Sequence, residues 1–189
     1  QLKDGELIIM HDDNFLRTTG TDQALYDLNS HQLEAYNQAH IWMDWEKQLT
    51  PTLRQTLSII HDFEHIEVEV KAVATMAEAE KLVLELQKQL HGFEQTAVIT
   101  SFDLKIHQAL KQQYSIFKRG LLIEDDIKHK AIEQALELDC CQIGWMNQVA
   151  TDEIIQATQQ AHLQISVWTV NNVERAKHLQ SLGIDGLIT

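Results

Sequence analysis

The chain has 189 residues, of which 44% are apolar, and it carries a formal net charge of −13 at pH 7. This length and apolar content are typical of one folded domain and exclude a disordered chain. The acidic balance argues against nucleic acid and anionic membranes as partners, because phosphate groups are bound by clusters of Lys and Arg. We therefore expect a single domain over residues 1–189, with no nucleic-acid partner and no stable membrane association.

The first residues and the two cysteines bear on where the protein works. The chain begins without Met, and residues 1–6 are polar and charged, unlike a signal peptide. We expect the true start, with any targeting signal, to lie upstream. Cys140 and Cys141 are adjacent, where a mutual disulfide would be strained and no CxxC metal spacing exists. Buried, reduced thiols favour a cytoplasmic protein.

Short apolar segments alternate with segments of helical spacing along most of the chain. Runs rich in Val, Ile and Leu predict strands at 7–10, 66–71, 97–101, 120–123, 142–145, 164–170 and 186–189. Helical spacing predicts helices at 52–63, 76–90, 104–114, 127–138, 152–162 and 173–182. Most of these strands lack polar alternation, which is typical of strands covered on both faces. The succession predicts a parallel sheet of βα units.

Local signals support several of these boundaries. Thr75 with Glu78 is typical of a capping box, and Thr151 is expected to cap the following helix. The Asp4-Gly5 pair predicts a tight turn ahead of the first strand. Residues 14–49 are irregular and predict a loop with short helices at the mouth of a barrel. Histidines on predicted helices and loops are expected to be solvated: His31, His40, His91, His107, His129, His162 and His178.

Polar side chains at strand ends are the first candidates for function, because in a parallel βα barrel they converge on one mouth. Within residues 66–71, alternation places Glu67, Glu69 and Lys71 on one face and the apolar residues on the other. Charges that point into a barrel need a divalent metal or mutual pairing, since unpaired buried carboxylates are costly. A metal site and a self-contained Glu–Lys ion pair both remain open on this segment.

Ordered motifs along the chain resemble the glycerophosphodiester phosphodiesterase family. His11–Asn14 and Leu16–Thr19, preceded by Lys3-Asp4-Gly5, are similar to the family's central signature. The later strand ends are similar too, in the same order: Glu69-Val70-Lys71, Thr100-Ser101-Phe102-Asp103, Trp168-Thr169-Val170-Asn171 and Gly183-Ile184-Asp185-Gly186. The resemblance covers essentially the whole chain. It implies an α/β fold, a (β/α)8 TIM barrel of the phospholipase-C-like phosphodiesterase type, here without its first strand and helix and part of its second strand.

The resemblance also implies an activity: metal-dependent hydrolysis of glycerophosphodiesters to sn-glycerol 3-phosphate and an alcohol, within lipid and glycerol metabolism. His11 would be the general acid that protonates the departing alcohol oxygen. Glu69 would be one carboxylate ligand of Mg²⁺ or Ca²⁺.

Other residues are implied to bind the substrate. Lys71 would hold a phosphate oxygen. Phe102 and Trp168 would line the pocket for the glycerol part, with ordinary core packing as their alternative role, and Asn147 would face the same pocket.

Some family elements fall outside the chain, among them a His-Arg pair and a Glu-x-Asp strand end, so the 189 residues alone are expected to be inactive. Glu67 stands where the family often has Asn, and Ala72 replaces a frequent Pro. Glu67 could add a carboxylate to the metal site or pair with a buried cation, and we favour the pairing. Two other functions remain open. One is a related phospholipase of the phosphatidylinositol or sphingomyelinase D type, and the other is a non-catalytic barrel that binds a phosphorylated ligand or a protein.

Overall fold

The computed structural model describes residues 1–42 and 44–189, which form two compact units. The N-terminal unit comprises Gln1–Phe63, with Lys88–Leu90 grouped with it. The sheet unit comprises Glu64–Gln87 and His91–Thr189. None of the helices in the described part of the chain is long and apolar enough to span a bilayer.

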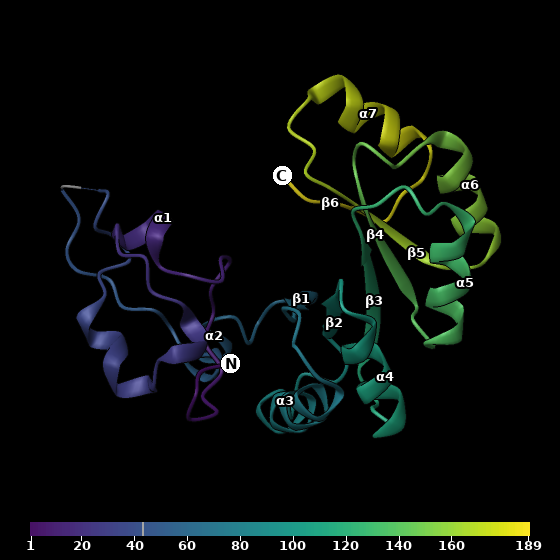
Figure 1. Cartoon of the computed structure of the whole chain (residues 1–189). Coiled ribbons are helices and arrows are strands. Elements are labelled where there is room, and N and C mark those ends of the chain that lie inside the picture. Colours follow the sequence, from purple (N-terminus) through teal and green to yellow (C-terminus); the bar gives the residue numbers. More distant parts are fainter. Residues whose placement is uncertain (43) are drawn as a thin grey trace. The chain divides into compact units, whose positions relative to one another are not determined.

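The sheet unit is built on one parallel sheet of six strands. They are β1 (Ile66–Glu69), β2 (Ala97–Ser101), β3 (Lys118–Ile123), β4 (Gln142–Met146), β5 (Gln164–Trp168) and β6 (Gly186–Leu187). Helices connect them in turn: α3 (Met76–Gln89), α4 (Leu104–Gln112), α5 (His129–Glu137), α6 (Asp152–Gln160) and α7 (Val173–Ser181). The order in the sheet follows the chain, and each strand pairs in parallel with the next (Figure 1). This is the topology of a (β/α) barrel, so the predicted fold class, an incomplete barrel, is confirmed.

One face of the sheet packs on the helices, which lie along its outer side (Figure 1). Alternate residues of β3, β4 and β5 form a buried core with α5, α6 and α7: Leu121, Ile123, Ile143, Trp145, Ile165 and Val167 meet Ala131, Ile132, Ile155 and Leu179. Burial of this apolar surface is the main stabilising term, at about 25 cal/mol per Å².

The residues between these positions face the inside of the partial barrel. Glu69, Thr100, Gly120 and Gln142 share one register row across four strands. Gln142 Nε2 donates to Glu67 Oε1 at 2.7 Å, although β4 and β1 are three strands apart. Such a contact requires the sheet to curl, so polar and small residues line its concave side.

Helix starts follow the predicted caps, whereas helix ends come earlier than predicted. Glu78 N–H donates to Thr75 Oγ1 at 3.2 Å and Thr75 N–H to Glu78 Oε2 at 2.9 Å, which confirms the capping box. Thr151 Oγ1 accepts from the N–H of Ile154, as expected of a cap. After α4 and α6 the chain adopts positive φ at Tyr114 (51°) and His162 (59°). A residue in the left-handed conformation commonly ends a helix, and that residue is usually glycine. Because neither Tyr114 nor His162 is glycine, the sequence did not indicate these two helix ends.

Short helices and a small core of its own build the N-terminal unit. The helices are α1 (Leu16–Thr19), η1 (Leu25–Asp27), η2 (Ser30–Ala35) and α2 (Leu53–Ile59). Leu2, Phe15, Leu25, Leu28 and Leu33 form the core. Short helices joined by irregular segments are present in residues 14–42 and 44–49, as predicted; residue 43 lies outside the described residues.

The strand predicted at residues 7–10 is not formed. Ile8 makes an isolated antiparallel bridge to Thr52, and Ile9 N–H donates to Pro51 O at 2.9 Å. The segment therefore pairs with the lead-in to α2 instead of joining a sheet. The predicted turn before it is present: Gly5 has φ 93°, and Leu2 N–H donates to Glu6 O at 2.9 Å.

His107 is buried in α4, so the expectation that it is solvated is wrong. Its Nε2 lies 3.1 Å from Ser101 O, and its Nδ1 lies 3.8 Å from Cys140 Sγ. Burial lowers the pKa of His107 and raises the pKa of the Cys140 thiol to about 12. Both cysteines are free thiols, and Cys140 is an unreactive one because a protonated thiol is a poor nucleophile.

Candidate active site

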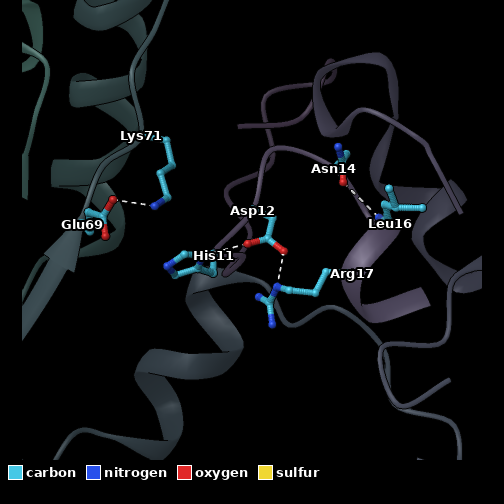
Figure 2. A network of polar contacts seen from close by, with 7 residues as sticks. All are labelled: His11, Asp12, Asn14, Leu16, Arg17, Glu69 and Lys71. Atoms are coloured by element: carbon cyan, nitrogen blue, oxygen red, sulfur yellow. Dashed lines mark hydrogen bonds and ion pairs between the residues drawn. The ribbon is translucent and has the colours of Figure 1, made fainter. Parts of the chain in front are cut away.

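His11 is held by its neighbour in the N-terminal unit. His11 Nδ1 lies 2.8 Å from Asp12 Oδ1, and Arg17 Nε donates to Asp12 Oδ2 at 2.6 Å (Figure 2). The bond from Arg17, followed by the one from His11, lowers the pKa of Asp12. An ionised carboxylate can only accept, so Nδ1 of His11 is the donor. The other ring nitrogen, Nε2, points away from Asp12 and is the one that can transfer a proton.

A buried phenylalanine anchors the loop that presents His11. Phe15 is fully buried, and Thr19 Oγ1 donates to Phe15 O at 2.9 Å. Asn14 Oδ1 accepts from Leu16 N–H at the start of α1, and Gly20 ends that helix with φ 74°. The imidazole of His11, four residues before Phe15, is 79% exposed.

At the end of β1, Glu69 and Lys71 form an ion pair. Lys71 Nζ lies 2.5 Å from Glu69 Oε1 (Figure 2), and each side chain is about one third exposed. Their placement on one side of the strand follows from the alternation in the sequence. One ammonium group uses only part of the hydrogen-bonding capacity of a carboxylate, so Glu69 can accept a further ligand.

The aromatic residues predicted for the substrate pocket lie in contact. The rings of Phe102 and Trp168 meet edge to face with centroids 5.4 Å apart, and Trp168 Nε1 donates to Gly144 O at 3.1 Å. Phe102 follows β2 and Trp168 ends β5, so the contact lies at the carboxyl end of the curled sheet. Phe102 is 36% exposed, which sets it apart from the core.

Asn147 follows β4 and is tied to two neighbouring elements. Its Oδ1 accepts from Arg175 Nε at 2.9 Å, and its N–H donates to Trp168 O at 2.5 Å. Arg175 Nη2 also donates to Ala150 O at 2.5 Å. Arg175 was not singled out from the sequence. A signal existed, because a basic residue in the first turn of a helix opposes the helix dipole and so indicates a specific partner.

Two more carboxylates near the strand ends have their own partners. Glu67 accepts from the neutral amide of Gln142 and lies 3.3 Å from His65 Nε2, so the expected pairing with a buried cation is wrong. Burial alone would raise the pKa of Asp103, but hydrogen bonds from the N–H groups of Val73 and Lys105, with the Lys105 ammonium at 3.0 Å, lower it. Within residues 1–42 and 44–189, no three His, Cys, Asp or Glu side chains come together as a metal site would require.

Of the six predicted site residues, the structure therefore joins Glu69 to Lys71, Phe102 to Trp168, and Asn147 to the strand end that bears Trp168. All five belong to the sheet unit, and His11 belongs to the N-terminal unit.

Comparison with known proteins places both units in one family. The sequence model of the "Glycerophosphoryl diester phosphodiesterase family" matches residues 1–189. A glycerophosphodiester phosphodiesterase of Caldanaerobacter subterraneus subsp. tengcongensis is 22% identical over 191 residues, which cover 99% of this chain and 77% of the relative.

Solved structures agree with this match. A phosphodiesterase of Oleispira antarctica, in complex with the product sn-glycerol-3-phosphate, has a TM-score of 0.82 at 18% identity, with 98% of this chain and 76% of that chain covered. A glycerophosphodiester phosphodiesterase of Thermotoga maritima has a TM-score of 0.77 at 20% identity, with 100% and 78% covered. These similarities establish the fold, and the family match over residues 1–189 establishes membership. The chain belongs to the glycerophosphoryl diester phosphodiesterase family of phosphoric diester hydrolases.

Proposed function

We propose that the protein hydrolyses glycerophosphodiesters to sn-glycerol 3-phosphate and an alcohol, with a divalent cation and with His11 as general acid. The family match over the whole chain supports the reaction class. The product bound to the Oleispira antarctica relative supports the glycerol 3-phosphate half of the substrate. The observation that carries the catalytic part is the contact between Asp12 and Nδ1 of His11, because it leaves Nε2 for proton transfer.

In this proposal the protein's own groups divide the work. The overall reaction adds one water, whose oxygen ends on phosphorus in place of the alcohol oxygen. Nε2 of His11 gives its proton to that departing alcohol oxygen as its bond to phosphorus breaks, and the proton released from water makes good the one that the imidazole gave. The Lys71 ammonium contacts a phosphate oxygen. Because the chain has a net charge of −13, an anionic substrate needs such a cation within the site itself. Its present partner, Glu69, keeps that ammonium at the carboxyl end of β1.

The cation we propose is Mg²⁺ or Ca²⁺, with Glu69 as one oxygen ligand. A carboxylate that is about one third exposed at a strand end suits such hard ions. The described residues do not by themselves complete a coordination shell for this cation. When bound, a divalent cation would neutralise charge on the phosphate.

The remaining assignments concern the substrate pocket and the whole molecule. We assign Phe102 and Trp168 to the wall that faces the glycerol part, with Asn147 at its edge, on the basis of their contacts at the carboxyl ends of the strands.

We also propose that residues 1–189 belong to one barrel domain, since one family model spans both units. The two free thiols support a cytoplasmic setting.

The test is release of glycerol 3-phosphate from glycerophosphocholine by the full-length gene product. We expect EDTA to stop release, and added Mg²⁺ or Ca²⁺ to restore it. Glu69→Gln should raise the metal concentration needed for half-maximal rate by about tenfold or more, because a ligand is lost. Glu133→Gln, which alters an exposed carboxylate of α5, is the matched control. Full activity in EDTA, or an unchanged metal response of Glu69→Gln, would overturn the proposal.

A further inference from the structure

The N-terminal unit contains a cavity of about 420 Å³ that none of the roles above uses. It is lined by Gln38, Ala39, Trp42, Trp45 and Gln48. The two tryptophans are 51% and 68% exposed. Large aromatic side chains held at the surface around one cavity are typical of a ligand site, because burial elsewhere would stabilise the fold more.

Two backbone hydrogen bonds link Ala39, Trp42 and Trp45, which all line this cavity. Trp42 N–H donates to Ala39 O at 2.9 Å, and Trp45 N–H donates to Trp42 O at 3.1 Å. Ala39, which is almost fully buried, lines the cavity together with both tryptophans.

The polar part of the lining offers acceptors. Gln38 Nε2 donates to Thr50 Oγ1 at 2.6 Å, and Gln48 Nε2 donates to Glu46 O at 3.4 Å. Within the part of the chain that the structure describes, no donor is bonded to the side-chain oxygen of either glutamine. Acceptor oxygens suit a positively charged ligand and disfavour an anion.

The charged residues around the cavity also favour a cationic ligand. Asp44 and Glu46 are exposed beside the tryptophans. Lys47, the one Lys or Arg between residues 18 and 53, donates its ammonium to Glu34 O at 2.5 Å. Residues 1–63 as a whole carry ten Asp and Glu against four Lys and Arg. This field attracts cations and repels anionic ligands and anionic lipid surfaces.

We infer that the cavity between Trp42 and Trp45 binds a quaternary ammonium group, of the kind found in choline. Indole faces attract such a cation through their quadrupole, and a quaternary ammonium has no N–H group that would need an acceptor of its own. The further step, that this cation is the head group of a glycerophosphodiester substrate, rests on the proposed function. Binding of free choline to the cavity does not depend on that function, so an experiment can reject either one without rejecting the other.

Isothermal titration calorimetry of the full-length gene product with choline chloride tests the inference. The neutral isostere 3,3-dimethyl-1-butanol has the same shape without the charge, and we expect it to bind at least about fivefold more weakly. Trp45→Leu should weaken choline binding by about fivefold or more, with Trp45→Phe between the two. Phe63→Leu, at an aromatic residue of the same unit that is 60% exposed, is the matched control and should bind as the wild type does.

Three results would overturn the inference. Equal affinity for choline and its neutral isostere would show that the cavity binds apolar groups without recognising the positive charge. Unchanged choline binding in both Trp45→Leu and Trp42→Leu would place any choline site elsewhere. Binding to phosphatidylcholine vesicles without a response to free choline would make the tryptophans a membrane contact. Because heat of binding is the readout, loss of hydrolysis in other experiments leaves the outcome intact.

Discussion

Phe102 and Trp168 meet edge to face, with ring planes at 88°, although they come from strands three positions apart in the sheet. The contact exists because the sheet curls toward its concave side, where small residues let neighbouring strands approach. The residues that permit this curl, and those that hold the strand ends, are therefore expected to be sensitive to substitution.

Gly120→Ala should destabilise the sheet unit. A Cβ at Gly120 would lie 2.9 Å from Thr100 Cγ2 on the concave side. Thr100 is buried and β-branched, so its methyl group has little freedom to move. We expect a loss of about 1–3 kcal/mol in the free energy of unfolding, measured by urea denaturation. Gly186→Ala, whose Cβ would make an ordinary contact of 3.4 Å, is the control, and equal losses in both variants would contradict the packing argument.

Arg175→Met should cost stability because it removes two hydrogen bonds from a charged donor. Arg175 reaches Asn147 Oδ1 and Ala150 O, and Ala150 is buried. The expected loss is about 1–3 kcal/mol in thermal or chemical denaturation. Lys177→Met in the same helix removes a surface ion pair with Glu174 and should change stability by less than about 1 kcal/mol. Similar losses in the two variants would show that Arg175 does not tie α7 to the strand ends.

The buried His107 makes stability depend on pH in a defined direction. Burial lowers the pKa of His107 in the folded state below its ordinary value of 6.5, so between these two pH values the unfolded chain binds a proton that the folded chain does not. Stability should therefore be fully present above about pH 6.5 and decline as the pH falls toward the lowered pKa, by at most about 1.4 kcal/mol per pH unit.

Urea midpoints across this window measure the effect. His107→Phe should lose this part of the pH dependence whatever its absolute stability, whereas His129→Gln, at an exposed histidine of α5, should retain it. A His107→Phe variant with the wild-type slope would exclude His107 as the source.

Asp12→Asn should impair catalysis more than binding. The amide cannot hold Nδ1 of His11 and the guanidinium of Arg17 as the carboxylate does, so the imidazole would be misplaced. We expect kcat to fall by about tenfold to a hundredfold, with a smaller change in KM. Asp13→Asn is the neighbouring control, since Asp13 accepts from the Tyr26 hydroxyl and not from His11. An unchanged kcat for Asp12→Asn would mean that Asp12 does not position the histidine.

Much of the fold was predictable because its signals are local. Apolar runs such as residues 97–101 mark strands buried on both faces, and the Thr75–Glu78 and Thr151 caps mark helix starts. The pairing of Glu69 with Lys71 follows from the alternation of one strand.

The contacts that were missed depend on how distant segments meet. The bond from Gln142 to Glu67 and the bond from Arg175 to Asn147 join residues 75 and 28 positions apart. The curvature of the sheet brings the first pair together, and the pairing of β4 with β5 brings the second pair together. The solvation expected of His107 failed because its helix turns that position inward, toward Ser101 and Cys140.

The most direct test of the account compares two leaving groups in His11→Ala of the full-length gene product. With glycerophosphocholine, whose alcohol must be protonated as it leaves, the variant should lose about 10²–10⁴ in rate of glycerol 3-phosphate release. With a p-nitrophenyl diester of glycerol 3-phosphate, whose phenolate leaves without a proton, the loss should be far smaller. Equal losses on both substrates, or full activity on the first, would contradict the role of His11 as general acid.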